Sequence, residues 1–189
     1  LPNRSAEIPT PLVNVDDICK QAYSIAIELL TKSNRLSEAH KQDIKRITEV
    51  IIKGVASGDS FRIAVPLFTG GGKSTCVIAS IVALKDTAYS VVVATEQVQE
   101  MANMIKAIID YAPEMADQVG GYHQVRNAPI DSIHRHQISK TQFLFVTHQR
   151  VKRGQQPEYD NYDGETRSIA LWDEVFQSTE SHAVSLENL

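Results

Sequence analysis

Two groups of residues in this 189-residue chain have the types and spacing that phosphate chemistry requires. The first is the segment Gly70 to Ser74, in which three glycines precede a lysine and a hydroxyl residue. Glycines allow backbone conformations that a Cβ forbids, and a helix that starts directly after them directs its first N–H groups at the same point. Lys73 would then reach the terminal phosphates of a nucleotide, and the Ser74 hydroxyl would ligate Mg²⁺.

The second group is the carboxylate pair Asp173 and Glu174, which follows the apolar run Ile169–Trp172. Ligands of open α/β sheets bind at the carboxyl ends of the strands, so a strand here would place both carboxylates in such a crevice. Asp173 would hold Mg²⁺ directly or through water, and Glu174 would orient and deprotonate the attacking water. The alternative for an Asp-Glu pair is a surface turn, but the preceding strand favours the chemical role.

The glycine segment departs from the P-loop pattern G-x-x-x-x-G-K-[ST], because the position of its first glycine is Leu67. A flexible glycine turn before a lysine is the alternative interpretation. The order of strand, loop and helix favours phosphate binding. We expect Thr69, Gly71 and Thr75 to belong to the same nucleotide-binding segment.

Hydrophobic periodicity predicts the elements that must position these residues. Apolar residues at helical spacing predict helices over 16–31, 37–54, 73–84 and 96–109. Asn14 or Asp16 would cap the first helix and Ser37 the second, which Gly54 would end. Apolar and β-branched runs predict strands near 61–66, 90–95, 119–125, 143–147 and 168–172. Strands alternating with helices favour an α/β fold with a mostly parallel sheet, over residues 14–189 after an irregular arm at 1–13.

The glycine segment also carries a family resemblance. Thr69, Gly70, Gly72, Lys73 and Ser74 match the T-G-x-G-K-[ST] loop of superfamily 1 and 2 helicases, which commonly lacks the first glycine. The region 41–176 resembles the N-terminal motor lobe of a superfamily 2 helicase. The resemblance implies a RecA-like P-loop fold that binds and hydrolyses ATP with Mg²⁺ and moves along DNA or RNA.

The same resemblance assigns roles to further residues. Gln42 would read the adenine ring, Thr95 and Gln97 would grip the nucleic-acid backbone, and Thr147 with Arg150 would form the next nucleic-acid contact. The alternatives are a solvated Gln42, a strand-to-helix turn capped by Thr95, and a solvated helix start after Thr147. Phe176 departs from the family, because a phenyl ring cannot make the hydrogen bond that His or Asp makes at this position.

The resemblance also implies a second RecA-like lobe that supplies an arginine finger. The chain begins with Leu1 rather than Met and ends shortly after Glu174, so we expect it to be the first lobe of a longer motor. The other functions left open are a terminase-like DNA-packaging ATPase and a nucleotide-gated interaction module without turnover.

Composition adds weaker constraints. The formal charge of −4 provides no general attraction to nucleic acid, so binding would depend on a local patch such as 148–153. Cys19 and Cys76 are too few and too far apart for a disulfide framework or a zinc site. His134 and His136 lack a nearby third ligand, which favours a solvated pair over a metal site. No apolar run approaches a membrane span and no secretion signal is present, so we expect a cytoplasmic protein.

Overall fold

The computed structural model describes residues 14–32, 36–57, 71–152 and 159–172. Its longer helices are α1 (Val15–Thr31), α2 (Glu38–Ser57), α3 (Lys73–Ala83) and α4 (Val98–Tyr111), and α5 (His148–Lys152) is a short one. The 3₁₀ helices are η1 (Pro113–Met115) and η2 (Arg135–Lys140). The strands are β1 (Val91–Thr95), β2 (Val119–Tyr122), β3 (Phe143–Thr147), β4 (Asn161–Tyr162), β5 (Glu165–Thr166) and β6 (Ile169–Trp172).

Four of these strands form one sheet in the order β2-β3-β1-β6, and every neighbouring pair is parallel. The register pairs Thr95 with Thr147 and Ala94 with Trp172, so the carboxyl ends of β1, β3 and β6 lie at one edge. The remaining strands, β4 and β5, form an antiparallel hairpin. The prediction of an α/β fold with a mostly parallel sheet is therefore confirmed. The strand predicted near 61–66 lies outside the described residues.

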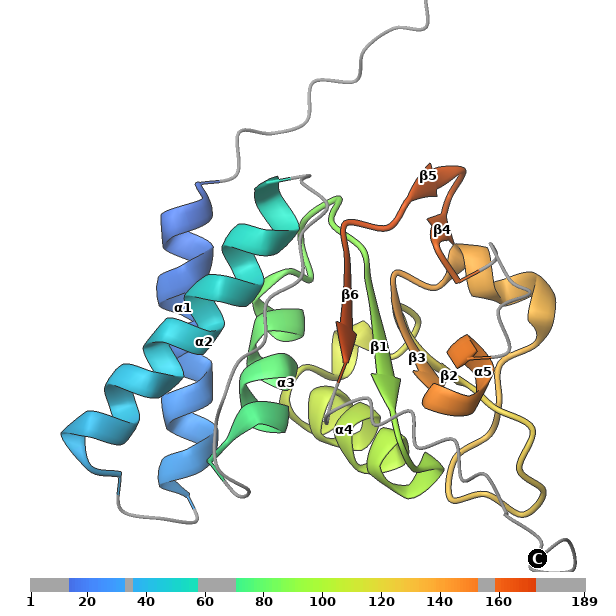
Figure 1. The fold of residues 1–189 in the computed structure, drawn as a ribbon, viewed down its shortest axis with the longest axis horizontal. Coiled ribbons are helices and arrows are strands. Elements are labelled where there is room, and N and C mark those ends of the chain that lie inside the picture. Colours follow the sequence, from blue (N-terminus) through green and yellow to red (C-terminus); the bar gives the residue numbers. More distant parts are fainter. Residues whose placement is uncertain (1–13, 33–35, 58–70, 153–158, 173–189) are drawn as a thin grey trace, which may run out of the picture.

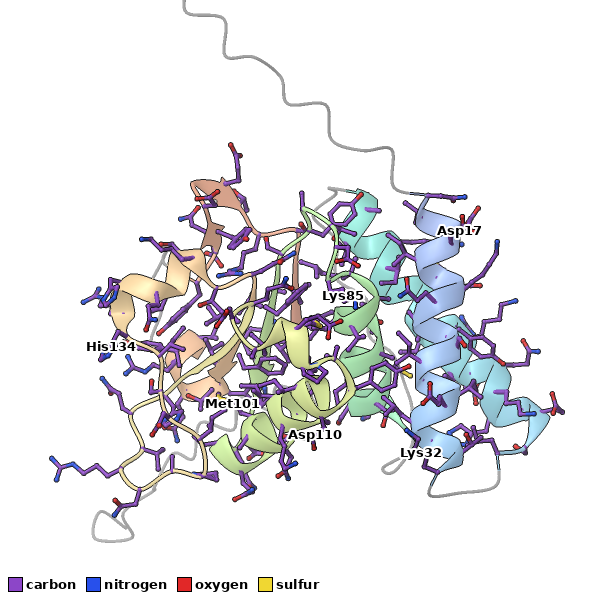
Figure 2. All side chains as sticks on the ribbon, turned by 180° about the vertical axis from the view of Figure 1, so that it is seen from behind. Asp17, Lys32, Lys85, Met101, Asp110 and His134 are labelled. Carbon is purple, nitrogen blue, oxygen red and sulfur yellow. The ribbon has the colours of Figure 1, made fainter. Side chains whose placement is uncertain are left out.

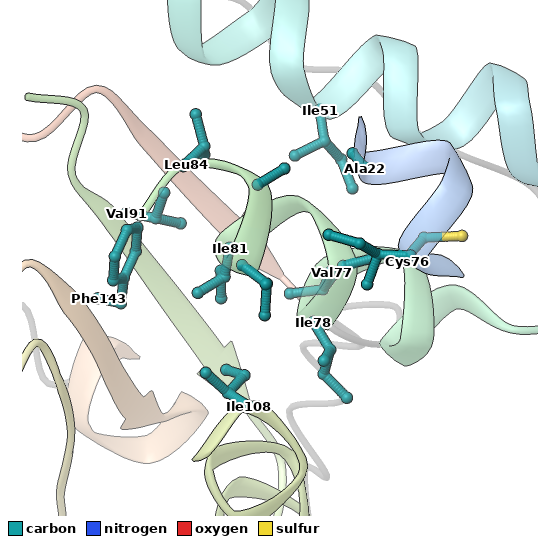
Figure 3. Packing of buried hydrophobic residues seen from close by; sticks show 14 of the residues in the cluster. Ala22, Ile51, Cys76, Val77, Ile78, Ile81, Leu84, Val91, Ile108 and Phe143 are labelled. Atoms are coloured by element: carbon teal, nitrogen blue, oxygen red, sulfur yellow. The ribbon is translucent and has the colours of Figure 1, made fainter. Parts of the chain in front are cut away.

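The sheet is covered on both faces, as the continuous apolar runs of β1 and β3 require. Val91, Val93, Phe143 and Phe145 belong to the cluster that includes α1, α2, α3 and α4. The alternate residues of the same strands face the opposite way, where they pack with Ile138 of η2 and with Tyr159. Figure 3 shows part of the larger cluster around α3.

Helix α3 is enclosed along most of its length, since its residues from Cys76 to Ala83 are all buried. It contacts α1, α2 and α4, so the first two helices form a layer outside it (Figure 1). Helix α3 runs opposite to β1, which follows it after a short connection. Its N-terminus therefore lies at the same end of the molecule as the carboxyl ends of β1 and β6, the lower edge in Figure 1.

The predicted caps of the first two helices are confirmed. The Asn14 side chain accepts a hydrogen bond from the Asp16 amide at 3.1 Å, and the Ser37 hydroxyl accepts one from the His40 amide at 3.2 Å. The prediction that Gly54 ends α2 was wrong, because the helix continues to Ser57. Gly54 is buried inside the helix instead of forming its C-cap.

The start of α4 and the end of β2 also differ from the prediction. Helix α4 begins at Val98 rather than at residue 96, because the Thr95 hydroxyl donates to the Gln97 carbonyl and closes a turn first. Strand β2 ends at Tyr122 rather than at residue 125. The next amide, that of His123, donates to the Ser132 hydroxyl, so the chain pairs there with its own returning loop. Among the described residues, no helix has both the length and the apolarity needed to cross a bilayer.

Candidate functional site

The turn before α3 contains a glycine in a left-handed conformation. Gly72 is the N-cap of α3 and has φ 87° and ψ 17°, a left-handed conformation that favours glycine. The Cys76 amide makes the first helical hydrogen bond, to the Gly72 carbonyl at 2.9 Å. The four amides before Cys76 therefore have no acceptor within the helix. Together with the helix dipole, they favour an anion at this end of α3.

The residues expected to hold the anion and its metal begin the helix. Lys73, Ser74 and Thr75 form the first turn of α3 and are all partly exposed. Helix α3 is thus half accessible at its N-terminus and buried from Cys76 onward, where burial raises the pKa of the Cys76 thiol to about 12. A thiol with so high a pKa is not a nucleophile at neutral pH.

Two side chains from α1 and α2 contact the glycine turn. The His40 Nε2 atom lies 3.0 Å from the Gly71 carbonyl oxygen. Leu30 lies over Gly72 so closely that a Cβ at this position would be 3.1 Å from Leu30 Cδ1. The sequence analysis predicted neither contact, because residue spacing does not show which helices pack against the loop.

Gln42, the predicted adenine contact, is exposed on α2. It is two positions from His40, which places the two side chains about 200° apart around the helix. His40, rather than Gln42, is therefore the residue of this helix that reaches the turn. The adenine role of Gln42 remains a prediction.

The other half of the predicted site was expected at the carboxyl edge of the sheet, directly after β6. Trp172 ends β6 beside Ala94 and is 42% exposed, although it lies in a strand. Asp173 and Glu174, which follow it in sequence, lie outside the described residues, as do Thr69 and Gly70. Within the described residues, no three Asp, Glu, His or Cys side chains lie close enough together to hold a metal ion.

The predicted nucleic-acid contacts differ in their accessibility. Thr95 is fully buried and its hydroxyl donates to the Gln97 carbonyl at 3.2 Å, whereas the Gln97 side chain is exposed. The alternative that Thr95 caps α4 was wrong, because Gln97 occupies the N-cap position. Thr147 is partly exposed at the end of β3, and the Arg150 guanidinium lies 4.7 Å from the centre of the Tyr122 ring.

His148 is a buried residue at this edge that the sequence did not single out. Its Nε2 atom lies 3.1 Å from the Ala94 carbonyl oxygen, and its ring centre lies 5.3 Å from that of Trp172. It therefore connects the start of α5 to the ends of both β1 and β6. The position of His148 directly after a predicted strand was the only sign in the sequence that it could lie at the sheet edge. That position does not show which strands its ring contacts.

No protein-family model, curated protein or solved structure matches this chain. The functional argument therefore depends on the geometry of the turn and of the sheet edge.

His134 and His136 are exposed on η2 and its N-cap (Figure 2 labels His134). Their rings stack with centres 5.6 Å apart and planes 8° apart. This histidine pair is far in sequence from the glycine turn, and we do not include it in the candidate site.

Proposed function

We propose that the N-terminus of α3 binds the phosphates of ATP, and that the chain is the ATP-hydrolysing motor lobe of a helicase or nucleic-acid translocase. The observation that carries this proposal is the left-handed Gly72 directly before Lys73, at the start of a buried helix. A glycine in this conformation leaves the N–H groups at the start of the helix accessible to an anion. The next residue, Lys73, supplies the positive charge that phosphates require.

The surroundings of the turn support a bound triphosphate. Gly71 and Gly72 have no side chains that would limit access to the turn, and Leu30 packs against Gly72. Lys73 would neutralise the terminal phosphates. The Ser74 hydroxyl and Asp173 would hold Mg²⁺, which would neutralise charge on the phosphates when bound. Glu174 would orient and deprotonate the attacking water.

The sheet order supports a RecA-like arrangement. Strand β6, which precedes the carboxylates in sequence, pairs with β1, which follows α3. The start of α3 and the ends of β1 and β6 lie at one end of the molecule (Figure 1). This is the end at which open α/β sheets bind ligands, so residues after β6 and the turn before α3 would face a common ligand.

The proposed partners are DNA or RNA and a second RecA-like lobe. Thr147 and Arg150 would provide the polar and cationic groups at the carboxyl edge, and the exposed Gln97 lies two residues after the end of β1, which pairs with β3. Arg167 does not serve as an arginine finger, because its guanidinium is buried among backbone carbonyls. The finger would come from the second lobe.

Calorimetric titration with ATP and Mg²⁺ tests the phosphate site. We expect saturable binding by the parent protein and loss of at least tenfold in affinity in Lys73→Ala, because this change removes the cation next to the turn. Lys140→Ala on η2, where Lys140 is exposed, is the matched control and should bind as the parent does. Equal affinity in the parent and Lys73→Ala would refute the assignment.

A further inference from the structure

The contact between His40 and Gly71 joins the two parts of the chain that lie on either side of the predicted strand near 61–66. The Gly71 carbonyl is an acceptor only, so the His40 Nε2 atom must carry the hydrogen of the 3.0 Å bond. Both the neutral Nε2–H form and the imidazolium can donate this bond. The tautomer with hydrogen on Nδ1 cannot.

The position of His40 is itself fixed. It lies in the first turn of α2, where its amide donates to the Ser37 hydroxyl at 3.2 Å. The next amide, that of Lys41, donates to the Ser37 carbonyl at 3.0 Å. The capped helix end therefore fixes the backbone that carries the His40 ring.

The hydrogen bond has a consequence for the following amide. In a trans peptide the carbonyl oxygen and the next N–H point in opposite directions. When His40 holds the Gly71 carbonyl toward α2, the Gly72 N–H points away from α2. An anion at the turn is attracted by this N–H and would be repelled by the carbonyl oxygen if the peptide were reversed.

Leu30 of α1 lies against Gly72 from another side. Its Cδ1 atom is so close that a Cβ on Gly72 would be crowded at 3.1 Å, so an apolar side chain limits the space around this residue. Glycine has a large choice of backbone conformations, and two adjacent glycines would otherwise flip their shared peptide easily. The contacts from α1 and α2 thus select one orientation.

We infer that His40 is a positioning residue that orients the Gly71–Gly72 peptide for binding a polyphosphate. The identity of the ligand in this inference rests on the proposed function, whereas the orientation of the peptide is independent of that function. His40 acts through the backbone and contacts no phosphate itself. Its contribution is preorganisation, since a peptide already oriented loses less conformational entropy when the anion binds.

Three variants test this role by calorimetry with Mg²⁺-ATP and, separately, with inorganic tripolyphosphate. His40→Leu keeps the size and removes the donor, so affinity for both ligands should fall about five- to tenfold, as for loss of one hydrogen bond. His40→Gln restores a donor at similar reach and should recover to within about twofold of the parent. Ala39→Ser, an exposed neighbour, is the control and should bind as the parent does.

Two measurements on the free protein do not depend on a nucleotide. Exchange of the Cys76 amide, which reports the first hydrogen bond of α3, should be several-fold faster in His40→Leu than in the parent. Nitrogen-15 spectra of the parent histidines should show the hydrogen of His40 on Nε2. A parent protein with that hydrogen on Nδ1 would overturn the inference even if the variants do not fold.

The outcomes separate this inference from the proposed function. Absence of ATP binding by the parent would refute the proposed function, and the exchange and spectra would still decide whether His40 orients the turn. Binding by the parent, with unchanged affinity and unchanged Cys76 exchange in a folded His40→Leu, would overturn the positioning role alone.

Discussion

Gly72 and Gly164 have almost the same positive φ, 87° and 89°, in different surroundings. A Cβ on Gly72 would lie 3.1 Å from Leu30 Cδ1, whereas a Cβ on Gly164 would have no atom within 4 Å. The pair therefore separates the strain of the backbone from the effect of a close contact. Gly72 begins the helix that carries Lys73, and Gly164 only turns the β4–β5 hairpin.

We predict that Gly164→Ala lowers the free energy of unfolding by about 1 kcal/mol, the cost of a left-handed alanine. Gly72→Ala should cost roughly 1 kcal/mol more, because Leu30 must also move. Only Gly72→Ala should weaken ATP binding, since it alters the turn itself. Urea unfolding and calorimetry of both variants measure these effects. Equal loss of ATP affinity in the two variants would mean that the turn has no special role.

At the scale of elements, Arg167 joins three parts of the chain. Its guanidinium donates to the carbonyls of Tyr159, Gln142, Ile138 and Thr141 at 2.8 to 2.9 Å. These carbonyls belong to the segment before the β4–β5 hairpin, to the end of η2 and to the residues before β3. Arg167 is 6% exposed, and burial lowers its pKa to about 10, so it is still charged at neutral pH.

We predict that Arg167→Met lowers the free energy of unfolding by about 3 kcal/mol, because it removes the buried hydrogen bonds that the guanidinium donates to these carbonyls. Arg167→Lys should be intermediate, because an ammonium group cannot reproduce the planar set of donors. Chemical denaturation followed by circular dichroism measures the difference. Arg126→Met, at an exposed position after β2, is the control. If Arg167→Met were no less stable than this control, the guanidinium would not be what joins these elements.

The β4–β5 hairpin was not predicted, although the sequence contained a signal for it. Asp163 and Gly164 form the Asp-Gly pair typical of a two-residue hairpin turn, and both have positive φ. The flanking strands have only two residues each and no apolar alternation, so the periodicity that predicts strands was absent. Arg167 supplies the tertiary contact that such a short hairpin needs.

At the scale of the whole molecule, net charge and the proposed second lobe limit what this chain does alone. The formal charge of −4 provides no general attraction to nucleic acid. Phosphoryl transfer develops charge on the γ-phosphoryl oxygens, and an arginine finger contributes about 10³ to 10⁵ in rate in related reactions. Arg150 contacts the Tyr122 ring and Arg167 is buried, so neither is placed as a finger.

We predict that the isolated chain binds ATP but hydrolyses it very slowly, with or without single-stranded DNA or RNA. Any nucleic-acid binding should involve about two or three phosphate contacts, so the logarithm of affinity should fall gently with the logarithm of salt concentration. Phosphate release and binding titrations across salt measure both quantities. Glu174→Gln, which removes the proposed base, sets the background rate. Strong stimulation of the parent monomer above this background would show that the chain does not need a second lobe.

Local patterns in the sequence were sufficient for the four longer helices, including the one that begins at Lys73, and for the parallel sheet. Helical and strand periodicities and caps are properties of neighbouring residues, so they can be recognised without the fold. The strand order, the buried state of Thr95 and the contact of His40 with Gly71 depend on which elements pack together.

The glycines of β2 show the same limit most clearly. A Cβ on Gly121 would lie 2.7 Å from the Met101 sulfur, and one on Gly120 would lie 2.8 Å from Ile133 Cγ2. Glycine has a low propensity for the interior of a strand, so the local sequence gave little indication of this strand. Here both faces of β2 are approached by residues distant in sequence, and only the absence of side chains leaves room for them. The sequence by itself determined the four longer helices, the strands of the parallel sheet and the placing of Lys73 and Ser74 at the start of α3, whereas long-range packing decided where those elements meet.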